Sequence, residues 1–385
     1  MRIGFNGFFL GQEGTGSGQY THHLLHALAQ VSRGDEYLLY ARAGSRHSAM
    51  WSAHELRTPF TWRFDNLDKV WFEQIAFPRV CRQAAVDVCH VPYFASPLFP
   101  TSPTVVTVHD LIPLLLPAYR GSLLVRLYTQ LVAAAARRAD QIITDSLASK
   151  NDIIKHLRVP ARRVHVIYLA VDSACRRISG EKRLGAVRRK YGLPEEYVLY
   201  LGGFDQRKNL RTMLHAYQHV LQVIGDATPT LVVAGRLPSV ETPLFPNPQR
   251  MARELGIEQH VLFIGWVAEE DKPALYSGAR FFVFLSLYEG FGLMLLEAMS
   301  CGTPVLAANS SSLPEIVGDS GLLVNPTDLD EISTGMLNLL QDAALRERLG
   351  ETALVQAAKF DWKRTAEQTR RVYELALGSD SAGFD

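Results

Sequence analysis

The sequence predicts an α/β protein of two domains, each built on a parallel sheet. At 385 residues the chain is longer than one hydrophobic core usually serves. Short apolar, β-rich runs alternate with longer helical patterns, which is typical of βαβ units. This alternation loosens after Tyr168 and restarts at Tyr197. We therefore expect an N-terminal domain over residues 1–172, a C-terminal domain over 173–359, and a last helix with its tail over 360–385.

The elements of the first domain follow from its apolar runs. A charged, glycine-containing stretch from Ser173 to Tyr191 then predicts an interdomain linker. The expected strands are Ile3 to Phe5, Thr104 to Val108, Gln141 to Thr144 and Val164 to Tyr168, and the expected helices are Thr21 to Ala29, Leu123 to Arg138 and Ala148 to Leu157.

The second domain repeats the pattern, and a final amphipathic helix opens at Asp361 and ends near Leu377. The Gly/Ser/Asp tail after this helix is expected to fray. The strands expected in the second domain are Tyr197 to Leu201, Thr230 to Ala234, Val261 to Ile264, Phe281 to Phe284 and Pro304 to Ala307, with a helix through Leu210 to Val220.

Composition narrows the class of partner. With 40 basic and 39 acidic side chains, the chain has no strong field for nucleic acid or an anionic membrane. The four cysteines lack CxxC pairing, and the N-terminus lacks the apolar segment of a signal peptide. No apolar run approaches the roughly 20 residues of a membrane span. We expect a cytoplasmic protein, with the inner face of the membrane reached through peripheral contact at most, and no nucleic-acid partner.

The strongest motif runs from Ser286 to Pro304 and joins a buried strand to a helix through a glycine turn. Gly290 and Gly292 let the backbone approach a ligand closely. The N–H groups that open the helix, from Phe291 through Leu293 to Met294, would form an anion site. The motif therefore predicts a diphosphate site.

Two glutamates accompany this helix. Glu289 precedes it, and Glu297 lies eight residues later, about two turns along. We expect both carboxylates to face one cleft and accept hydrogen bonds from hydroxyl groups. The alternative, a helix-terminal glutamate plus a surface one, is the better reading of an isolated pair. Here the glycines and the buried strand favour a site.

A second glycine turn follows another predicted strand, from Leu201 to Leu210, and contains Gly203, Arg207 and Lys208. Open α/β sheets bind ligands at the carboxyl ends of their strands. We expect the two cations to neutralise a diphosphate in place of a metal ion. The alternative is a solvated basic helix start.

The N-terminal domain offers two weaker signals. The run from Gly14 to Tyr20, including Gly16, follows the first strand and suits a phosphate or sugar, but it lacks the GxGxxG spacing. His109 and Asp110 come directly after a buried strand, where polar side chains would face the crevice. A hydrogen-bonded structural histidine is an equal alternative.

Two metal-like patterns are set aside. His22 and His26 have helical spacing without the glutamate of an HExxH site. Asp328 and Asp330 spell DxD, but Asp328 follows Asn-Pro-Thr and is interpreted as a helix cap. We expect no metal ion.

Taken together, these segments resemble the retaining glycosyltransferases of family 4, over nearly the whole chain. The resemblance implies the GT-B fold, with two facing Rossmann-like domains and a last segment that crosses back onto the N-terminal domain, with Trp362 as its anchor. The alternative is that the last helix caps the C-terminal domain locally. The motifs that carry the resemblance are Gly14 to Tyr20, Val108-His-Asp-Leu, Asp145-Ser146, Val166 to Asp172, Gly202 to Asn209, Ala234-Gly235, Phe263 to Trp266, and Glu289 to Glu297 with Gly302-Thr-Pro.

The family's roles carry over onto the matching positions. Glu289 would lie near the transferred sugar, and His109 near the hydroxyl on C6 of the donor sugar, as catalytic residues. Glu297 would bind the nucleotide ribose. The donor diphosphate would be held by Gly16, Gly203, Arg207, Lys208, Gly290, Phe291, Gly292, Leu293 and Met294.

The resemblance is strongest to bacterial polysaccharide mannosyltransferases. It implies transfer of mannose from GDP-mannose to a glycan or lipid-linked glycan acceptor, with retention and without a metal cofactor. A front-face mechanism is implied, with Glu289 as a covalent nucleophile as the alternative. The other functions considered are a UDP-sugar-dependent glucosyltransferase, a sugar-nucleotide epimerase, a glycan phosphorylase and a silent sugar-binding module. An NAD-dependent oxidoreductase is disfavoured because GxGxxG is missing.

Overall fold

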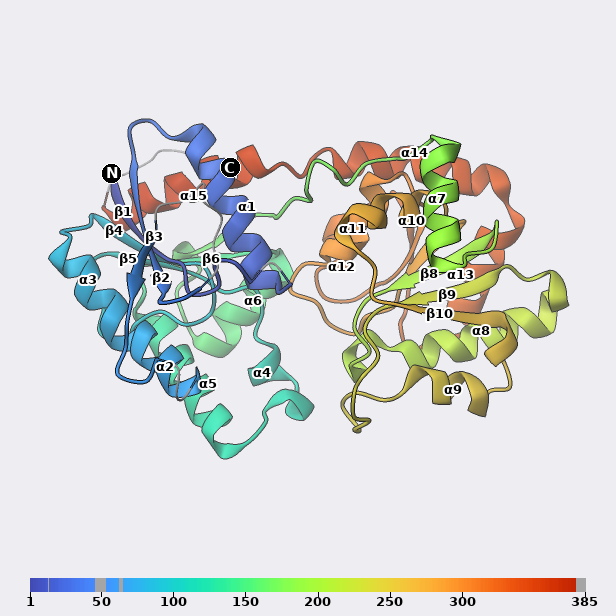
Figure 1. The fold of residues 1–385 in the computed structure, drawn as a ribbon, viewed down its shortest axis with the longest axis horizontal. Helices are drawn as coiled ribbons and strands as arrows, with labels where there is room; N and C mark the ends of the chain where they lie inside the picture. Colours follow the sequence, from blue (N-terminus) through green and yellow to red (C-terminus); the bar gives the residue numbers. More distant parts are fainter. Residues whose placement is uncertain (13, 46–52, 62–64, 379–385) are drawn as a thin grey trace. The chain divides into compact units, whose positions relative to one another are not determined.

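The computed structural model describes residues 1–12, 14–45, 53–61 and 65–378 (Figure 1). The chain divides into two compact units. Unit 1 comprises Met1–Leu169 with Asp361–Asp385, and unit 2 comprises Ala170–Phe360. The sequence sets these boundaries at 172/173 and 359/360, whereas the structure sets them at 169/170 and 360/361.

Unit 1 contains a seven-stranded parallel sheet in the order β3-β2-β1-β4-β5-β6-β7. β4 and β5 are buried along their whole length, as expected for central strands of a parallel sheet. The strands are β1 Arg2–Asn6, β2 Glu36–Arg42, β3 Ala53–Leu56, β4 Val88–Val91, β5 Thr104–Thr107, β6 Gln141–Thr144 and β7 Val164–Val166.

The helices of unit 1 include one from the far end of the chain, α15. They are α1 Gly16–Val31, α2 Asp65–Trp71, α3 Phe77–Gln83, α4 Ile112–Leu115, α5 Leu123–Arg138, α6 Leu147–Asp152 and α15 Trp362–Ala376, with the π-helical segments η1 Phe72–Ala76 and η3 Ile153–Leu157 and the 3-10 turns η2 Pro117–Tyr119 and η4 Ala161–Arg163.

The first helix begins earlier than the sequence predicts. α1 opens at Gly16 rather than Thr21, because Thr15 caps it by accepting a hydrogen bond from the N–H of Gly18 at 3.1 Å. Gly18 is required by packing, since a Cβ there would lie 2.1 Å from the carbonyl oxygen of Gln12. The glycines therefore belong to a helix start and not to an open loop.

The C-terminal helix packs within unit 1. Thr365 donates to the carbonyl of Tyr168 at 2.7 Å, and the ring of Trp362 stacks on His23 at 5.2 Å. Tyr373 is fully buried. The helix thus belongs to unit 1 and not to the domain that it follows in the sequence, and the alternative of a local cap is wrong. Of the tail that the sequence predicts to fray, residues 379–385 lie outside the described residues.

Unit 2 contains a six-stranded parallel sheet in the order β10-β9-β8-β11-β12-β13. Its central strands β8, β11 and β12 are entirely buried. The strands are β8 Tyr197–Leu201, β9 Thr230–Ala234, β10 Val261–Gly265, β11 Phe281–Phe284, β12 Val305–Ala308 and β13 Leu322–Val324.

The helices of unit 2 begin inside the stretch that the sequence predicts as a linker. α7 covers Glu181–Tyr191. Its sequence is rich in charged residues and resembles a linker, because only Val187 is buried. It is held to unit 2 by Lys190 and the Tyr191 hydroxyl, 2.5 and 3.0 Å from Asp271. The remaining helices are α8 Leu210–Ile224, α9 Pro248–Glu254, α10 Lys272–Ser277, α11 Leu293–Ser300, α12 Leu313–Val317, α13 Leu329–Gln341 and α14 Ala343–Ala357, with turns η5 Gln206–Lys208, η6 Gly225–Ala227, η7 Glu258–His260 and η8 Glu269–Asp271.

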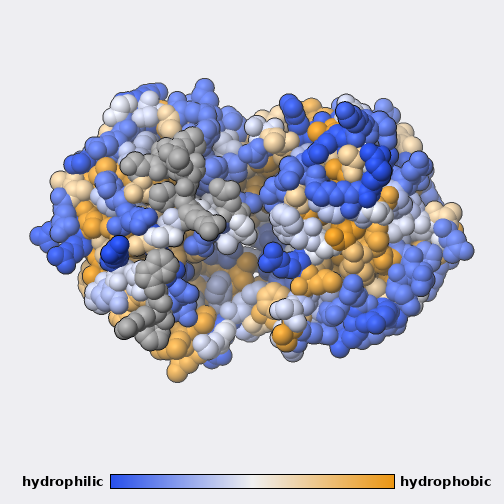
Figure 2. Space-filling view, in the orientation of Figure 1, coloured by the Kyte–Doolittle hydropathy of each residue, from blue (hydrophilic) through white to orange (hydrophobic). Residues whose placement is uncertain are grey.

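The face of the molecule in Figure 2 is largely hydrophilic, with scattered hydrophobic areas. The start of α5 contributes three exposed leucines, Leu123, Leu124 and Leu127.

Asp328 caps α13 by accepting a hydrogen bond from the N–H of Glu331 at 3.0 Å, which confirms its interpretation as a helix cap.

Candidate active site

Two turns of unit 2 are adjacent because the strands before them are paired. β8 and β11 are parallel neighbours, so the segments after them emerge at the same edge of the sheet. The backbone N–H of Leu287 and the hydroxyl of Ser286 both donate to the carbonyl of Arg207, at 2.8 and 3.1 Å. The two sequence motifs that follow these strands are thus joined directly.

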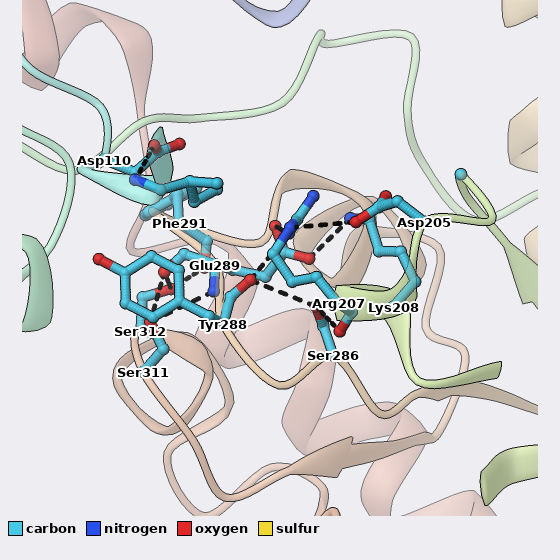
Figure 3. Close-up of polar contacts among 12 residues, drawn as sticks. Asp110, Asp205, Arg207, Lys208, Ser286, Tyr288, Glu289, Phe291, Ser311 and Ser312 are labelled. Atoms are coloured by element: carbon cyan, nitrogen blue, oxygen red, sulfur yellow. Dashed lines mark hydrogen bonds and ion pairs between the residues drawn. The ribbon is translucent and has the colours of Figure 1, made fainter. Parts of the chain in front are cut away.

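An ion cluster forms where the turns meet (Figure 3). The carboxylate of Glu289 lies between two cations, 2.7 Å from Nη1 of Arg207 and 2.6 Å from Nζ of Lys208. Arg207 also donates to the carbonyl of Tyr288 at 2.7 Å and lies 3.4 Å from Asp205. The side chains of Arg207, Lys208 and Glu289 are at most 12% exposed, so the alternative of a solvated basic helix start is wrong.

The cations decide the charge of Glu289. Burial alone would raise its pKa, but the charges of Lys208 and Arg207 outweigh burial, and the pKa is lowered below the usual value. Glu289 is therefore ionised at neutral pH. The pairing also explains how two cations are kept in a nearly closed site, because each has a carboxylate within contact distance.

Serine hydroxyls hold the loop that carries Glu289. Ser311 and Ser312 both donate to its backbone carbonyl, at 2.5 and 3.0 Å, and Ser312 also donates to the carbonyl of Phe291. At Gly292 the φ angle is +119°, and a Cβ would lie 2.7 Å from a methyl group of Leu313. Only glycine suits both the backbone angle and the space.

The first turn of α11 presents backbone donors. The first bonds of the helix are accepted by the carbonyl of Gly292 from Leu295 and Leu296. The N–H groups of Leu293 and Met294 precede these bonds and have no acceptor within the helix. They point out of the helix start, where an anion is favoured. Gly290 and Phe291 lie in the turn that leads into it.

Glu297 has partners of its own. It accepts a hydrogen bond from Tyr276 at 2.9 Å and lies 3.8 Å from Nζ of Lys272. Burial raises its pKa, against the opposing charge of Lys272. Glu289 and Glu297 are both largely buried, so neither is the surface residue of the alternative interpretation, but they contact different groups.

Gly203 lies in the turn after β8. Its carbonyl accepts a hydrogen bond from the hydroxyl of Tyr200, and a Cβ on Gly203 would approach Asp205 to 3.4 Å. Packing within unit 2 therefore tolerates a small side chain there.

His109 of unit 1 is fixed by two acceptors. Its Nδ1 lies 2.6 Å from Asp145, and its Nε2 lies 3.3 Å from the carbonyl of Pro92. Burial lowers its pKa, but the Asp145 carboxylate outweighs burial and raises the pKa above the usual value. An imidazolium, which carries a proton on each nitrogen, satisfies both acceptors.

The surroundings of His109 position its ring. Tyr20 meets the ring edge to face at 4.8 Å, and Ser149 donates to the backbone carbonyl of His109 at 3.0 Å. Asp110 accepts from the N–H of Ile112 at 2.9 Å, which fixes the start of α4. At Gly16, a Cβ would meet no atom within 4 Å, so packing does not require glycine there.

Sequence reasoning includes Asp145 and Asp205 only as parts of family motifs and gives them no role, and it does not name Tyr276 or Lys272. Asp145, Asp205, Tyr276 and Lys272 each hold an expected site residue. Asp145 and Asp205 follow buried strands, the same signal that identifies His109, and could have been found by it. Lys272 and Tyr276 lie on α10, and only the tertiary structure brings them to Glu297.

Within the described ranges, no group of three His, Cys, Asp or Glu side chains could hold a metal ion. His22 and His26 accordingly form no such group among these residues. No helix in the same part of the chain is long and apolar enough to cross a membrane.

Models of known protein families match both the N-terminal and the C-terminal part of the chain. Residues 14–174 match the model of Glycosyltransferase Family 4, and residues 186–355 match Glycosyl transferases group 1. The O-antigen chain mannosyltransferase B of Escherichia coli is 38% identical over 272 residues, which cover 70% of each chain. The serotype-specific mannosyltransferase WbdA of Escherichia coli is 35% identical over 266 residues, 68% of this chain but 32% of the relative.

The fold is also found in solved structures. The sucrose-phosphate synthase of Thermosynechococcus elongatus superposes with a TM-score of 0.77 at 22% identity, covering 99% of this chain and 100% of the other. At this identity the likeness shows the fold alone, which is the GT-B fold that the sequence predicts.

Proposed function

The chain belongs to the glycosyltransferases, with a family 4 N-terminal part and a group 1 C-terminal part, and we propose that it transfers mannose from GDP-mannose. The proposed acceptor is a glycan or lipid-linked glycan in polysaccharide biosynthesis. Two mannosyltransferase relatives at 38% and 35% identity support the choice of sugar. We also propose a cytoplasmic location with at most peripheral membrane contact, in line with 40 basic and 39 acidic residues.

The observation that carries the proposal is the cluster of Glu289, Arg207 and Lys208 next to the start of α11. A diphosphate at that helix start would be attracted by the N–H groups of Leu293 and Met294, which open the helix, and by both cations. We infer that the cations then share their charge between phosphate and Glu289. The carboxylate could in turn accept hydrogen bonds from the hydroxyls of the transferred sugar.

This arrangement supports a retaining reaction without a metal cofactor. The departing diphosphate would be stabilised by Arg207, Lys208 and the helix N–H groups while the sugar passes through an oxocarbenium-like state. Glu289 is held by two cations at contact distance, which makes it a weak nucleophile and favours the front-face mechanism over a covalent intermediate. Glu297 is proposed to bind the ribose, and His109 to lie near the hydroxyl on C6 of the donor sugar.

Calorimetry with GDP-mannose, UDP-glucose and ADP-glucose tests the donor. We expect GDP-mannose to bind most tightly, and Arg207→Ala to weaken it while the exposed Arg211→Ala does not. Tighter binding of UDP-glucose would replace the proposed donor. NMR of the product should show an α linkage, and turnover should persist in excess EDTA. Loss of turnover that magnesium or manganese restores would disprove the metal-free mechanism.

A further inference from the structure

Unit 1 contains a pocket of about 340 Å³ that no role described above explains. This volume lies at the small end of the range for ligand sites. Its walls are mainly aromatic and come from Phe9, Tyr93, Phe94, Tyr119 and Tyr128. Lys69, His109 and Asp110 add polar groups to the lining.

Lys69 occupies a cage of aromatic rings in this lining. Its ammonium lies 5.3, 5.7 and 5.1 Å from the ring centres of Phe9, Tyr93 and Tyr128. These contacts fix the cation by its attraction to the ring faces. The side chain is 28% exposed, so its end remains accessible from solvent.

Lys69 forms one long ion pair inside unit 1, with Glu73. Its closest carboxylate oxygen, on Glu73, is 3.8 Å away, which is beyond hydrogen-bonding distance. An ammonium carries three donors. A ligand with several oxygen acceptors would therefore find donors already in position.

The charges around the pocket select the kind of ligand. Glu73 lies fully buried beside Lys69, where it accepts from the Tyr128 hydroxyl at 2.9 Å, and Asp110 lines the pocket. The carboxylate of Asp110 in the lining disfavours a phosphate or carboxylate ligand. Aromatic walls with isolated polar groups suit instead a neutral ring that has one apolar face and hydroxyls at its edge.

We propose that this pocket binds the terminal sugar of a neutral glycan acceptor, with Lys69 as the residue that selects it. The inference rests on the proposed function and adds the chemistry of its acceptor. One face of the sugar ring packs on the aromatic walls, and ring hydroxyls accept hydrogen bonds from Lys69. His109 and Asp110 lie in the same lining, which places the acceptor beside the unit 1 residue proposed to contact the donor sugar.

Saturation-transfer NMR on the full chain tests the ligand class directly. The probes are α-mannobiose, maltose and mannose 6-phosphate. We expect at least one neutral disaccharide to bind more tightly than the phosphorylated sugar. Lys69→Met, which keeps a long apolar side chain among the rings, should weaken that binding about tenfold. Lys155→Met, at an exposed position of unit 1, serves as the control and should leave it unchanged.

Kinetics separate the acceptor from the donor. Lys69→Met should raise the acceptor KM by about tenfold, while the calorimetric Kd for GDP-mannose changes by less than about twofold. The proposal is overturned if no neutral disaccharide binds, if mannose 6-phosphate binds most tightly, or if Lys69→Met binds like the control. If GDP-mannose does not bind but disaccharide binding still depends on Lys69, the proposed donor is wrong. The assignment of the pocket as the acceptor-sugar site then stands.

Discussion

The hydroxyl of Tyr373 lies 2.7 Å from Nδ1 of His90, across 283 positions of sequence. Nε2 of His90 lies 3.0 Å from the hydroxyl of Thr107, which lies 3.2 Å from that of Tyr20, whose ring packs on His109. Burial lowers the pKa of His90 to about 3, so this histidine is neutral. A buried chain of polar contacts thus connects the C-terminal helix with the ring beside His109.

Tyr373→Phe should lower the free energy of unfolding by about 1–3 kcal/mol, because a buried nitrogen of His90 loses its partner. Thermal or urea unfolding measures the change. Tyr37→Phe is the matched control, since the described residues offer the buried Tyr37 hydroxyl no hydrogen bond. Equal losses in the two variants would show that the Tyr373 contact contributes nothing specific.

Asp145→Asn should lower the pKa of His109. Burial opposes the charged ring, and the Asp145 carboxylate is what raises the pKa above its usual value of 6.5. In the native protein, the raised pKa of His109 therefore increases the free energy of unfolding. This contribution is fully present below about pH 6.5 and is lost as pH rises through the raised pKa. NMR titration of the ring measures the shift. Asp65→Asn, at a side chain 85% exposed, is the control, and an unchanged His109 titration would contradict the assignment.

Glu289→Ala and the double change Arg207→Ala with Lys208→Ala should each reduce the transfer rate by about a hundredfold or more, which corresponds to roughly 3 kcal/mol of transition-state stabilisation. Glu289→Ala also leaves two cations without their carboxylate, so Glu289→Gln is the better variant for kinetics. Glu258→Gln, on an exposed turn of unit 2, is the control. Activity within a few-fold of the native protein, with an unchanged melting curve, would remove these residues from the site.

Glu73→Gln should change how stability depends on pH. Burial raises the pKa of Glu73 from 4.5 to about 7, against the charge of Lys69 and the Tyr128 hydroxyl. A raised carboxyl pKa increases the free energy of unfolding, by up to about 3 kcal/mol. This contribution is fully present below about pH 4.5 and is lost as pH rises towards 7. In unfolding measurements, the Glu73→Gln variant should not show this decrease in the free energy of unfolding between pH 4.5 and 7. The control variant Glu55→Gln, at an exposed position, should still show it. Identical pH slopes in the Glu73 variant and the native protein would contradict the raised pKa.

Several helices and strands could be predicted from local sequence, because the pattern of their own residues indicates them. β8, β9 and β11 have the predicted bounds, since each is a short apolar run buried on both faces. α5 likewise matches the prediction, capped at Ser122 and ended after two arginines. By contrast, the sequence does not predict α7 as a helix, because six of its eleven residues are charged and only Val187 is buried. It does not predict β2 and β3, because their mixed exposure gives a weak pattern.

The sequence by itself determined the two α/β units, the glycine turns after β8 and β11, and the residues Glu289, Arg207, Lys208 and His109. These depend on periodicity, on glycine and on polar residues at strand ends, which are properties of neighbouring positions. Only the tertiary structure decided which groups control them. Glu289 is paired with two cations 81 or more positions away, and His109 with an aspartate that follows another strand. Lys69 is held by rings from separate elements. The physical reason is that charge and burial depend on distance in space, which the order of strands sets and the sequence pattern does not record.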